Sequence, residues 1–180
     1  MLKIQELDKK LFEYFSRLKY YIENNNKNGY FDINKYYEDF FNDLLNLVFD
    51  LKLINLNGIK TNYPAIDLGD KESRICYQVT TIKKIEKIES TLKKFHETEL
   101  YKVYDSVNIL ILGDKTKHTK KLKFKEVNFN YDDNIIDLND LLKSIINIKN
   151  INKKEQIVKF IEKSLIENVE KKNMTQKNHY

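Results

Sequence analysis

The stretch that decides the fold is NYPAIDLGDKESRICYQVTT, residues 62–81. Apolar and polar side chains alternate through AIDLGD (65–70) and again through RICYQVT (74–80). This alternation is typical of β-strands, in which successive side chains point to opposite faces. DKES (70–73), preceded by Gly69, has the composition of a tight turn. The stretch therefore predicts a β-hairpin.

The hairpin has one apolar and one polar face. If the apolar sides of the two strands align, Asp67, Gln78 and Thr80 emerge together on the opposite face. The side chains expected on the apolar face are Ile66, Leu68, Ile75, Tyr77 and Val79. A polar hairpin of random sequence need not bring an acid and two polar residues together, so we treat this face as the candidate site.

Helical and strand patterns surround the hairpin. Apolar residues in steps of three and four predict helices over 2–24, 34–51, 82–98 and 153–171, and another that starts at Asp137 or Asn139. The apolar run SVNILILG (106–113) predicts a strand buried on both faces, and LKLINLNG (51–58) and Ile135–Ile136 predict short strands.

The order of these elements predicts an α/β fold, with a mixed central sheet of about four to five strands flanked by helices and extra N- and C-terminal helices. We expect residues 1–172 to form one domain with a core over about 35–145, and residues 173–180 to form a frayed tail.

Composition narrows the function classes. The 180 residues carry 32 Lys and Arg against 27 Asp and Glu, a net charge of +5, and the only arginines are Arg17 and Arg74. This charge is a mild bias toward anionic partners, and if nucleic acid binds, we expect contact with its backbone and little base-specific reading. The single cysteine, Cys76, excludes an internal disulfide. No apolar run approaches the roughly 20 residues that span a bilayer, which favours a cytoplasmic protein without a membrane partner.

The predicted order of helix, three strands, helix and strand resembles the core of the PD-(D/E)XK restriction-endonuclease-like superfamily over about residues 35–145. NYPAIDLGD, ICYQVT and the lysine-rich helix ending in LKKF are together similar to bacterial SMEK-domain proteins, and NIIDLNDLL resembles the closing strand and helix of that group. The resemblance implies a nuclease-like domain, in some cases associated with phage defence, that hydrolyses DNA phosphodiesters with Mg²⁺.

The resemblance also implies roles for individual residues. Asp67 matches the central metal-binding Asp, Gln78 matches the Glu of the family's Glu-x-Lys triplet, and Thr80 matches its Lys. Glu38, on the helix before the sheet, matches a supporting acid. The expected metal ligands are thus Asp67, Gln78 and Glu38. Gln78 supplies a neutral oxygen where the family has a carboxylate.

Thr80 lacks the positive charge of the lysine that it replaces. We expect Lys83 or Lys84, with Lys87 as a further candidate, to reach back to the site from the following helix. On this hypothesis the K83M and K84M variants lose cleavage activity.

Each of these features also has a purely structural interpretation. Asp67 or Asp70 can brace the turn, Gln78 and Thr80 can form a solvated strand face, and Glu38 can be a surface carboxylate. The lysine-rich stretch 114–126 can be a solvated loop or a phosphate-binding surface.

Two alternatives to a nuclease therefore stay open. One is a catalytically silent nuclease-fold module that binds nucleic acid or a partner protein. The other is a helical interaction protein whose helices 2–24 and 153–171 pair or form a homodimer through their apolar stripes.

Overall fold

The computed structural model describes residues 2–28, 34–117, 127 and 129–177. The helices are α1 (Lys3–Lys27), α2 (Asn34–Phe49), α3 (Ile85–Glu97), α4 (Tyr131–Asn134), α5 (Leu138–Ile146) and α6 (Ile151–Lys177). The strands are β1 (Ile54–Asn55), β2 (Leu68–Asp70), β3 (Ile75–Thr80), β4 (Ser106–Ile111) and β5 (Ile135–Asp137). Short 3₁₀ helices, η2 (Leu56–Gly58) and η3 (Leu100–Lys102), follow β1 and α3.

The five strands form one mixed sheet in the order β1-β2-β3-β4-β5. The first three strands are antiparallel, and β3, β4 and β5 are parallel. The predicted hairpin is present, with Leu68 opposite Tyr77 and Asp70 opposite Ile75. The predicted α/β class, with a mixed sheet flanked by helices and with terminal helices, is confirmed.

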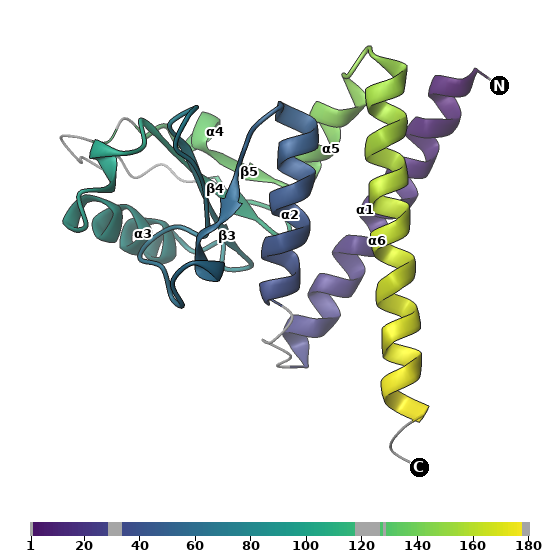
Figure 1. The fold of residues 1–180 in the computed structure, drawn as a ribbon, viewed down its shortest axis with the longest axis horizontal. Coiled ribbons are helices and arrows are strands. Elements are labelled where there is room, and N and C mark those ends of the chain that lie inside the picture. The colour runs from purple at the N-terminus through teal and green to yellow at the C-terminus, as the bar shows by residue number, and fades with distance from the viewer. Residues whose placement is uncertain (1, 29–33, 118–126, 128, 178–180) are drawn as a thin grey trace.

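Helices cover both faces of the sheet (Figure 1). α3 lies on one side, and α1, α2, α5 and α6 lie on the other. The alternation along β3 divides its side chains between two apolar clusters. Tyr77 and Val79 belong to the cluster on the side of α1, α2, α5 and α6, which we call the four-helix layer. Cys76 belongs to the cluster on the side of α3. The polar positions Gln78 and Thr80 share the face of Cys76, so they lie on the α3 side.

The apolar stripes of the two terminal helices face each other within one chain. Leu11, Phe15 and Leu18 of α1 and Ile157 and Ile161 of α6 are buried in the same cluster. The predicted pairing of these helices therefore occurs inside the molecule. This packing occupies the stripes that the helical-interaction hypothesis assigned to a homodimer.

Several boundaries differ from those predicted. The strand expected over 51–58 is limited to Ile54–Asn55, because the chain turns into η2. α6 extends to Lys177, into the segment predicted to be frayed, and residues 178–180 lie outside the described residues. Most of the lysine-rich stretch, residues 118–126, also lies outside them.

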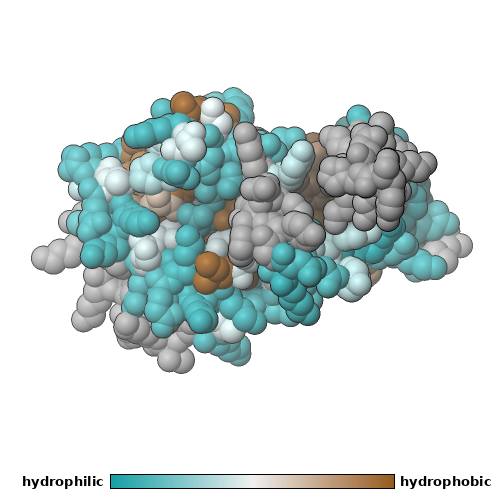
Figure 2. All heavy atoms as spheres, turned by 90° about the horizontal axis from the view of Figure 1, so that it is seen from below, coloured by the Kyte–Doolittle hydropathy of each residue, from teal (hydrophilic) through white to brown (hydrophobic). Residues whose placement is uncertain are grey.

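The surface is largely hydrophilic in the view of Figure 2, with small, separate hydrophobic areas. Large exposed apolar side chains include Phe12, Tyr20, Ile59 and Ile82. In the ranges that the structure describes, no helix combines the length and apolar character needed to cross a membrane.

Candidate functional site

Asp67 lies immediately before β2 and is fixed there by its own backbone. Its N–H donates to the carbonyl of Tyr77 at 2.9 Å, and its carbonyl accepts from the N–H of Leu56 at 2.7 Å. These bonds continue the sheet pairing by one residue, so the side chain of Asp67 points away from that of Leu68, to the α3 side. Only 7% of Asp67 is exposed.

Neutral donors surround the Asp67 carboxylate. Oδ2 accepts from the Gln78 side-chain nitrogen Nε2 and from the backbone N–H of Val79, the latter at 2.8 Å. Oδ1 accepts from Asn57 Nδ2 at 3.0 Å. The structure thus brings together Asp67 and Gln78, as the alternation of the hairpin predicts.

Asn57 connects Asp67 to a second carboxylate. The same nitrogen, Nδ2, also donates to Glu38 Oε2 at 3.1 Å. The other end of the amide, Oδ1, accepts from the backbone N–H of Tyr63 at 2.8 Å. Because one end faces two acceptors and the other faces a donor, the network fixes the orientation of the amide. Glu38 comes from α2 and Asn57 from η2, so three separate segments build this site.

The environment of Asp67 disfavours its charged form. Burial is the main cause that raises its pKa to about 6, and the nearby Glu38 carboxylate adds to the effect. The hydrogen bonds from Val79 and Asn57 and the positive charge of Lys87 oppose the rise. A buried carboxylate beside a second one is a common feature of functional sites.

The three candidate lysines lie in different places. Lys87 is half-buried in the first turn of α3, and its charge acts on Asp67. Lys83 and Lys84 are exposed on the extended segment before the helix, because α3 begins at Ile85 rather than at residue 82. The hydrogen bond from Lys19 is the main cause that lowers the pKa of Asp114, and the charge of Lys83 adds only a small effect there. Of the three lysines, Lys87 is the one whose charge acts on Asp67.

Gln78 and Thr80 take up different contacts. Gln78 presents its nitrogen to Asp67 and to the carbonyl of Val79, at 3.1 Å from the latter. A metal ion would need the amide oxygen instead. Thr80 lies on the same face of β3, and its Oγ1 accepts from the backbone N–H of Ile82 at 3.1 Å.

The donor set can be tested against Mg²⁺. Among the described residues, no group of three or more His, Cys, Asp or Glu side chains is arranged to hold a metal ion. Mg²⁺ in nucleotide-processing sites usually takes only one or two carboxylates and completes its shell with water and substrate phosphates. Asp67 Oδ1 and Glu38 Oε2 both lie within hydrogen-bond distance of one nitrogen. This pair of carboxylates fits such an ion.

Asp70 has the structural role that was one interpretation of its position. Its Oδ1 accepts from the backbone N–H groups of Glu72 and Ser73 at 2.9 and 3.0 Å, and its Oδ2 accepts from that of Lys52 at 2.8 Å. Although burial raises the pKa of Asp70, these bonds lower it below its usual value. Asp70 braces the turn and the start of β1.

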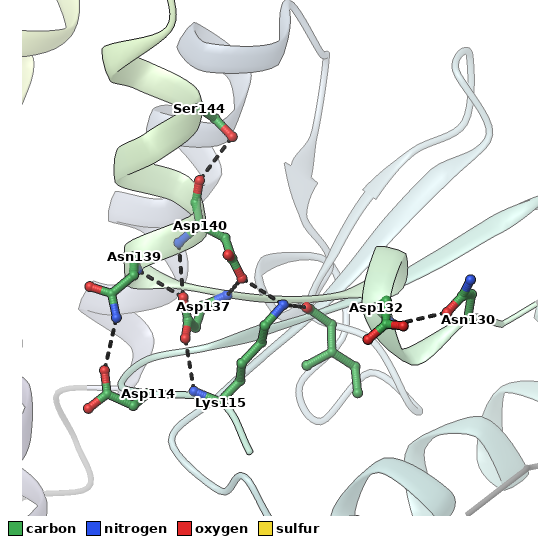
Figure 3. Close-up of polar contacts among 9 residues, drawn as sticks. Asp114, Lys115, Asn130, Asp132, Asp137, Asn139, Asp140 and Ser144 are labelled. Carbon is green, nitrogen blue, oxygen red and sulfur yellow. Dashed lines mark hydrogen bonds and ion pairs between the residues drawn. The ribbon is translucent and has the colours of Figure 1, made fainter. Parts of the chain in front are cut away.

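The described start of the lysine-rich stretch is part of a structural network (Figure 3). Lys115 Nζ bonds to Asp140 Oδ2 and to the carbonyl of Ile135, both at 2.8 Å, and its backbone N–H donates to Asp137 at 2.9 Å. Asp137 also caps the N-terminus of α5. Lys115 therefore attaches the segment after β4 to α5. Lys117, two residues later, is exposed.

Asn57 is the site residue that the sequence analysis missed. It lies in LKLINLNG, where it reads as a turn residue before Gly58. The available signal is the pair Asn55 and Asn57: Asn55 Oδ1 accepts from the N–H of Asn57 and so caps η2.

Comparison with known proteins gives one match. The family model of the SMEK domain matches residues 10–146, which includes α2, the whole sheet and α3. No curated protein matches the chain, and no solved structure matches it.

Proposed function

Because the chain belongs to the SMEK domain family, we propose that it is a nuclease domain of PD-(D/E)XK type that hydrolyses DNA phosphodiesters with Mg²⁺. We place this activity in the bacterial cytoplasm, in defence against phage.

One observation carries the proposal: two carboxylates from distant parts of the chain converge at the hairpin. Asp67 and Glu38 contact the same nitrogen atom, at 3.0 and 3.1 Å, although they lie on different segments. Burial raises the pKa of Asp67, and repulsion from the half-buried Glu38 carboxylate adds to the rise. A fold tolerates such an arrangement at a cost in stability, and a cation is the partner that this arrangement suits best.

Asp67 and Glu38 are the residues that would hold the ion. Bound there, Mg²⁺ supplies Lewis-acid activation of the phosphate and lowers the pKa of a coordinated water. Lys87 takes the role of the lysine missing at Thr80, because its ammonium charge already acts on Asp67. In this position it balances negative charge that develops on the phosphate. The peptide N–H of Val79 keeps the Asp67 carboxylate oriented.

The DNA partner is supported by exposed lysines beyond the end of β3. Lys83, Lys84 and Lys117 are exposed, and in the part of the chain that the structure describes they form no ion pair. Thr116 Oγ1 donates to the carbonyl of Lys83 at 3.2 Å, which places the segments of these lysines side by side. Unpaired lysines on adjoining segments attract phosphates without regard to base sequence.

Incubation of supercoiled plasmid with the full chain and Mg²⁺ or Mn²⁺ tests the proposal. Wild-type protein is expected to nick or cut the plasmid, D67A is expected to be inactive, and K87M is expected to lose most of the activity. D132A is the matched control, because Asp132 is an exposed carboxylate on α4. Equal extents of plasmid cleavage by wild type and D67A would contradict the proposal.

A second candidate is the catalytically silent module, and a specific observation favours it. Two amides, from Asn57 and Gln78, donate to the carboxylates and satisfy them without a metal ion. For this candidate we expect DNA binding that weakens steeply with salt, is reduced in a K83Q/K84Q/K117Q variant and occurs without cutting. Absence of both cutting and DNA binding would favour the alternative in which the module binds a partner protein.

A further inference from the structure

We propose that the Asn57 side chain occupies the cation position between Asp67 and Glu38 and sets the affinity of the site by competing with the ion. This inference rests on the proposed function, because it concerns the same two carboxylates. It adds a regulatory residue that neither the family resemblance nor the hairpin pattern indicates.

The first step of the argument is the position of Nδ2. This single nitrogen lies 3.0 Å from Asp67 Oδ1 and 3.1 Å from Glu38 Oε2. An amide nitrogen carries two hydrogens, so each carboxylate receives one of them. The NH₂ group thus presents a partial positive charge to each carboxylate, in the place where a bound cation would neutralise both.

The second step is exclusion. Carboxylate oxygens lie about 2.0–2.1 Å from a bound Mg²⁺, so an ion shared by two carboxylates needs the space between them. The Asn57 nitrogen fills the corresponding space here. The ion and the NH₂ group therefore cannot both contact Asp67 and Glu38 in this arrangement.

The third step is the lock on the amide. Oδ1 of Asn57 accepts from the backbone N–H of Tyr63 at 2.8 Å. A half-turn of the amide would point Oδ1 at the two carboxylates and Nδ2 at the N–H of Tyr63, so it would be repelled at both ends in the absence of a cation. Entry of the ion thus requires the loss of two hydrogen bonds to carboxylates and of one from Tyr63.

Titration of the full chain with MnCl₂ by calorimetry tests the competition directly. N57A removes the competing NH₂ group, and we expect it to bind Mn²⁺ about tenfold tighter than wild type, or more, since hydrogen bonds to charged groups are the strong ones. The D67N/N57A double variant should lose this binding. N139A is the control: the Asn139 amide donates to one carboxylate only, Asp114 Oδ1 at 3.0 Å, and lies far along the chain from the site. Equal or weaker binding by N57A would overturn the inference.

A second measurement does not depend on the folding of a variant. In wild-type protein, the ¹H–¹⁵N resonance of the Tyr63 backbone should shift during a Mg²⁺ titration, because its acceptor on Asn57 moves away. The same titration of D67N should leave that resonance in place. An unshifted Tyr63 resonance in wild-type protein at saturating Mg²⁺ would contradict the exchange of amide for cation.

The outcomes separate this inference from the proposed function. Metal-dependent cutting by wild type, together with unchanged affinity in N57A, contradicts the inference and leaves the nuclease in place. Tight, Asp67-dependent binding in N57A without cutting by any variant supports the inference and contradicts the nuclease.

Discussion

At the scale of the single residue, Asp67 was predictable and Asn57 was not. Alternation along each strand, with the apolar sides of the hairpin aligned, places Asp67 and Gln78 on one face, and the side chains do meet. Asn57 reaches the site only because η2 turns its amide toward two segments that are distant in sequence. The Asn55 cap within INLNG (54–58) indicates the turn, but nothing in this local sequence specifies which distant segments the Asn57 amide reaches.

The raised pKa of Asp67 has a measurable effect on stability. Its pKa is about 6 in the folded protein against 3.8 for the free side chain, so the folded state holds the proton more tightly than the unfolded state. Stability should therefore fall as the pH rises from about 4 to above 6. From a shift of about two units we expect a loss of about 3 kcal/mol in the free energy of unfolding.

Comparison with D67N isolates this effect, because Asn does not titrate while all other groups stay the same. Urea unfolding at pH 4 and pH 7.5, without divalent ions, should show wild type losing stability relative to D67N across this range. A difference between the two proteins that stays constant with pH would show that Asp67 ionises normally.

At the scale of the element, the hairpin was predicted correctly, but the segment that leads into its first strand was not. Ile66 was expected on the same face as Leu68, and this was wrong: Ile66 belongs to the α3-side cluster, while Leu68 belongs to the four-helix cluster. The reason is local. Ala65 has a φ of 68°, and the N–H of Ile66 donates to the carbonyl of Pro64 at 2.8 Å. Strict alternation holds only from Asp67 onward, where sheet pairing begins.

The close contact between β2 and the segment before β4 gives a second prediction. A Cβ atom at Gly69 would lie 2.8 Å from Cζ of Tyr104 and closer still to its hydroxyl oxygen. Tyr104 is 1% exposed, so its ring is enclosed by the core. Thermal or urea unfolding should therefore show that G69A is destabilised by about 1–3 kcal/mol.

Two further variants check the cause. Y104F should partly restore G69A and should cost little by itself, because the buried Tyr104 hydroxyl has no hydrogen-bond partner among the described residues. G113A is the matched control, since no atom lies within 4 Å of a Cβ at Gly113. Equal effects of G69A and G113A would rule out the steric explanation.

At the scale of the whole molecule, the four-helix layer joins the two ends of the chain. The sequence could not predict the contacts of Lys154, which is fully buried although the same helix carries the exposed Lys159 and Lys163. Its Nζ bonds to Asp8 Oδ1 at 2.6 Å and to the carbonyl of Ile146 at 2.8 Å. Helical periodicity gives the face of a residue but does not reveal a partner 146 positions away.

Loss of this contact should weaken the whole fold. We expect K154A to lower the free energy of unfolding by about 3 kcal/mol, through lost packing and the lost ion pair, and K154M to lower it by less because the apolar stem is kept. K153A is the control, since Lys153 pairs with Asp50, whose side chain is 82% exposed, and should cost no more than about 1 kcal/mol. Equal losses in K154A and K153A would contradict the assigned role of Lys154.

The central claim is that Glu38 and Asp67 act as one site in phosphodiester cleavage. The most direct measurement is a double-mutant cycle on the Mg²⁺-dependent rate of plasmid cleavage, with wild type, E38Q, D67N and the double variant. The effects of residues that act as a unit are not additive. We therefore expect each single substitution to lower the cleavage rate at least about 100-fold, and the double variant to be no slower than the less active single variant. Cleavage that persists in D67N, or losses that multiply in the double variant, would contradict the claim.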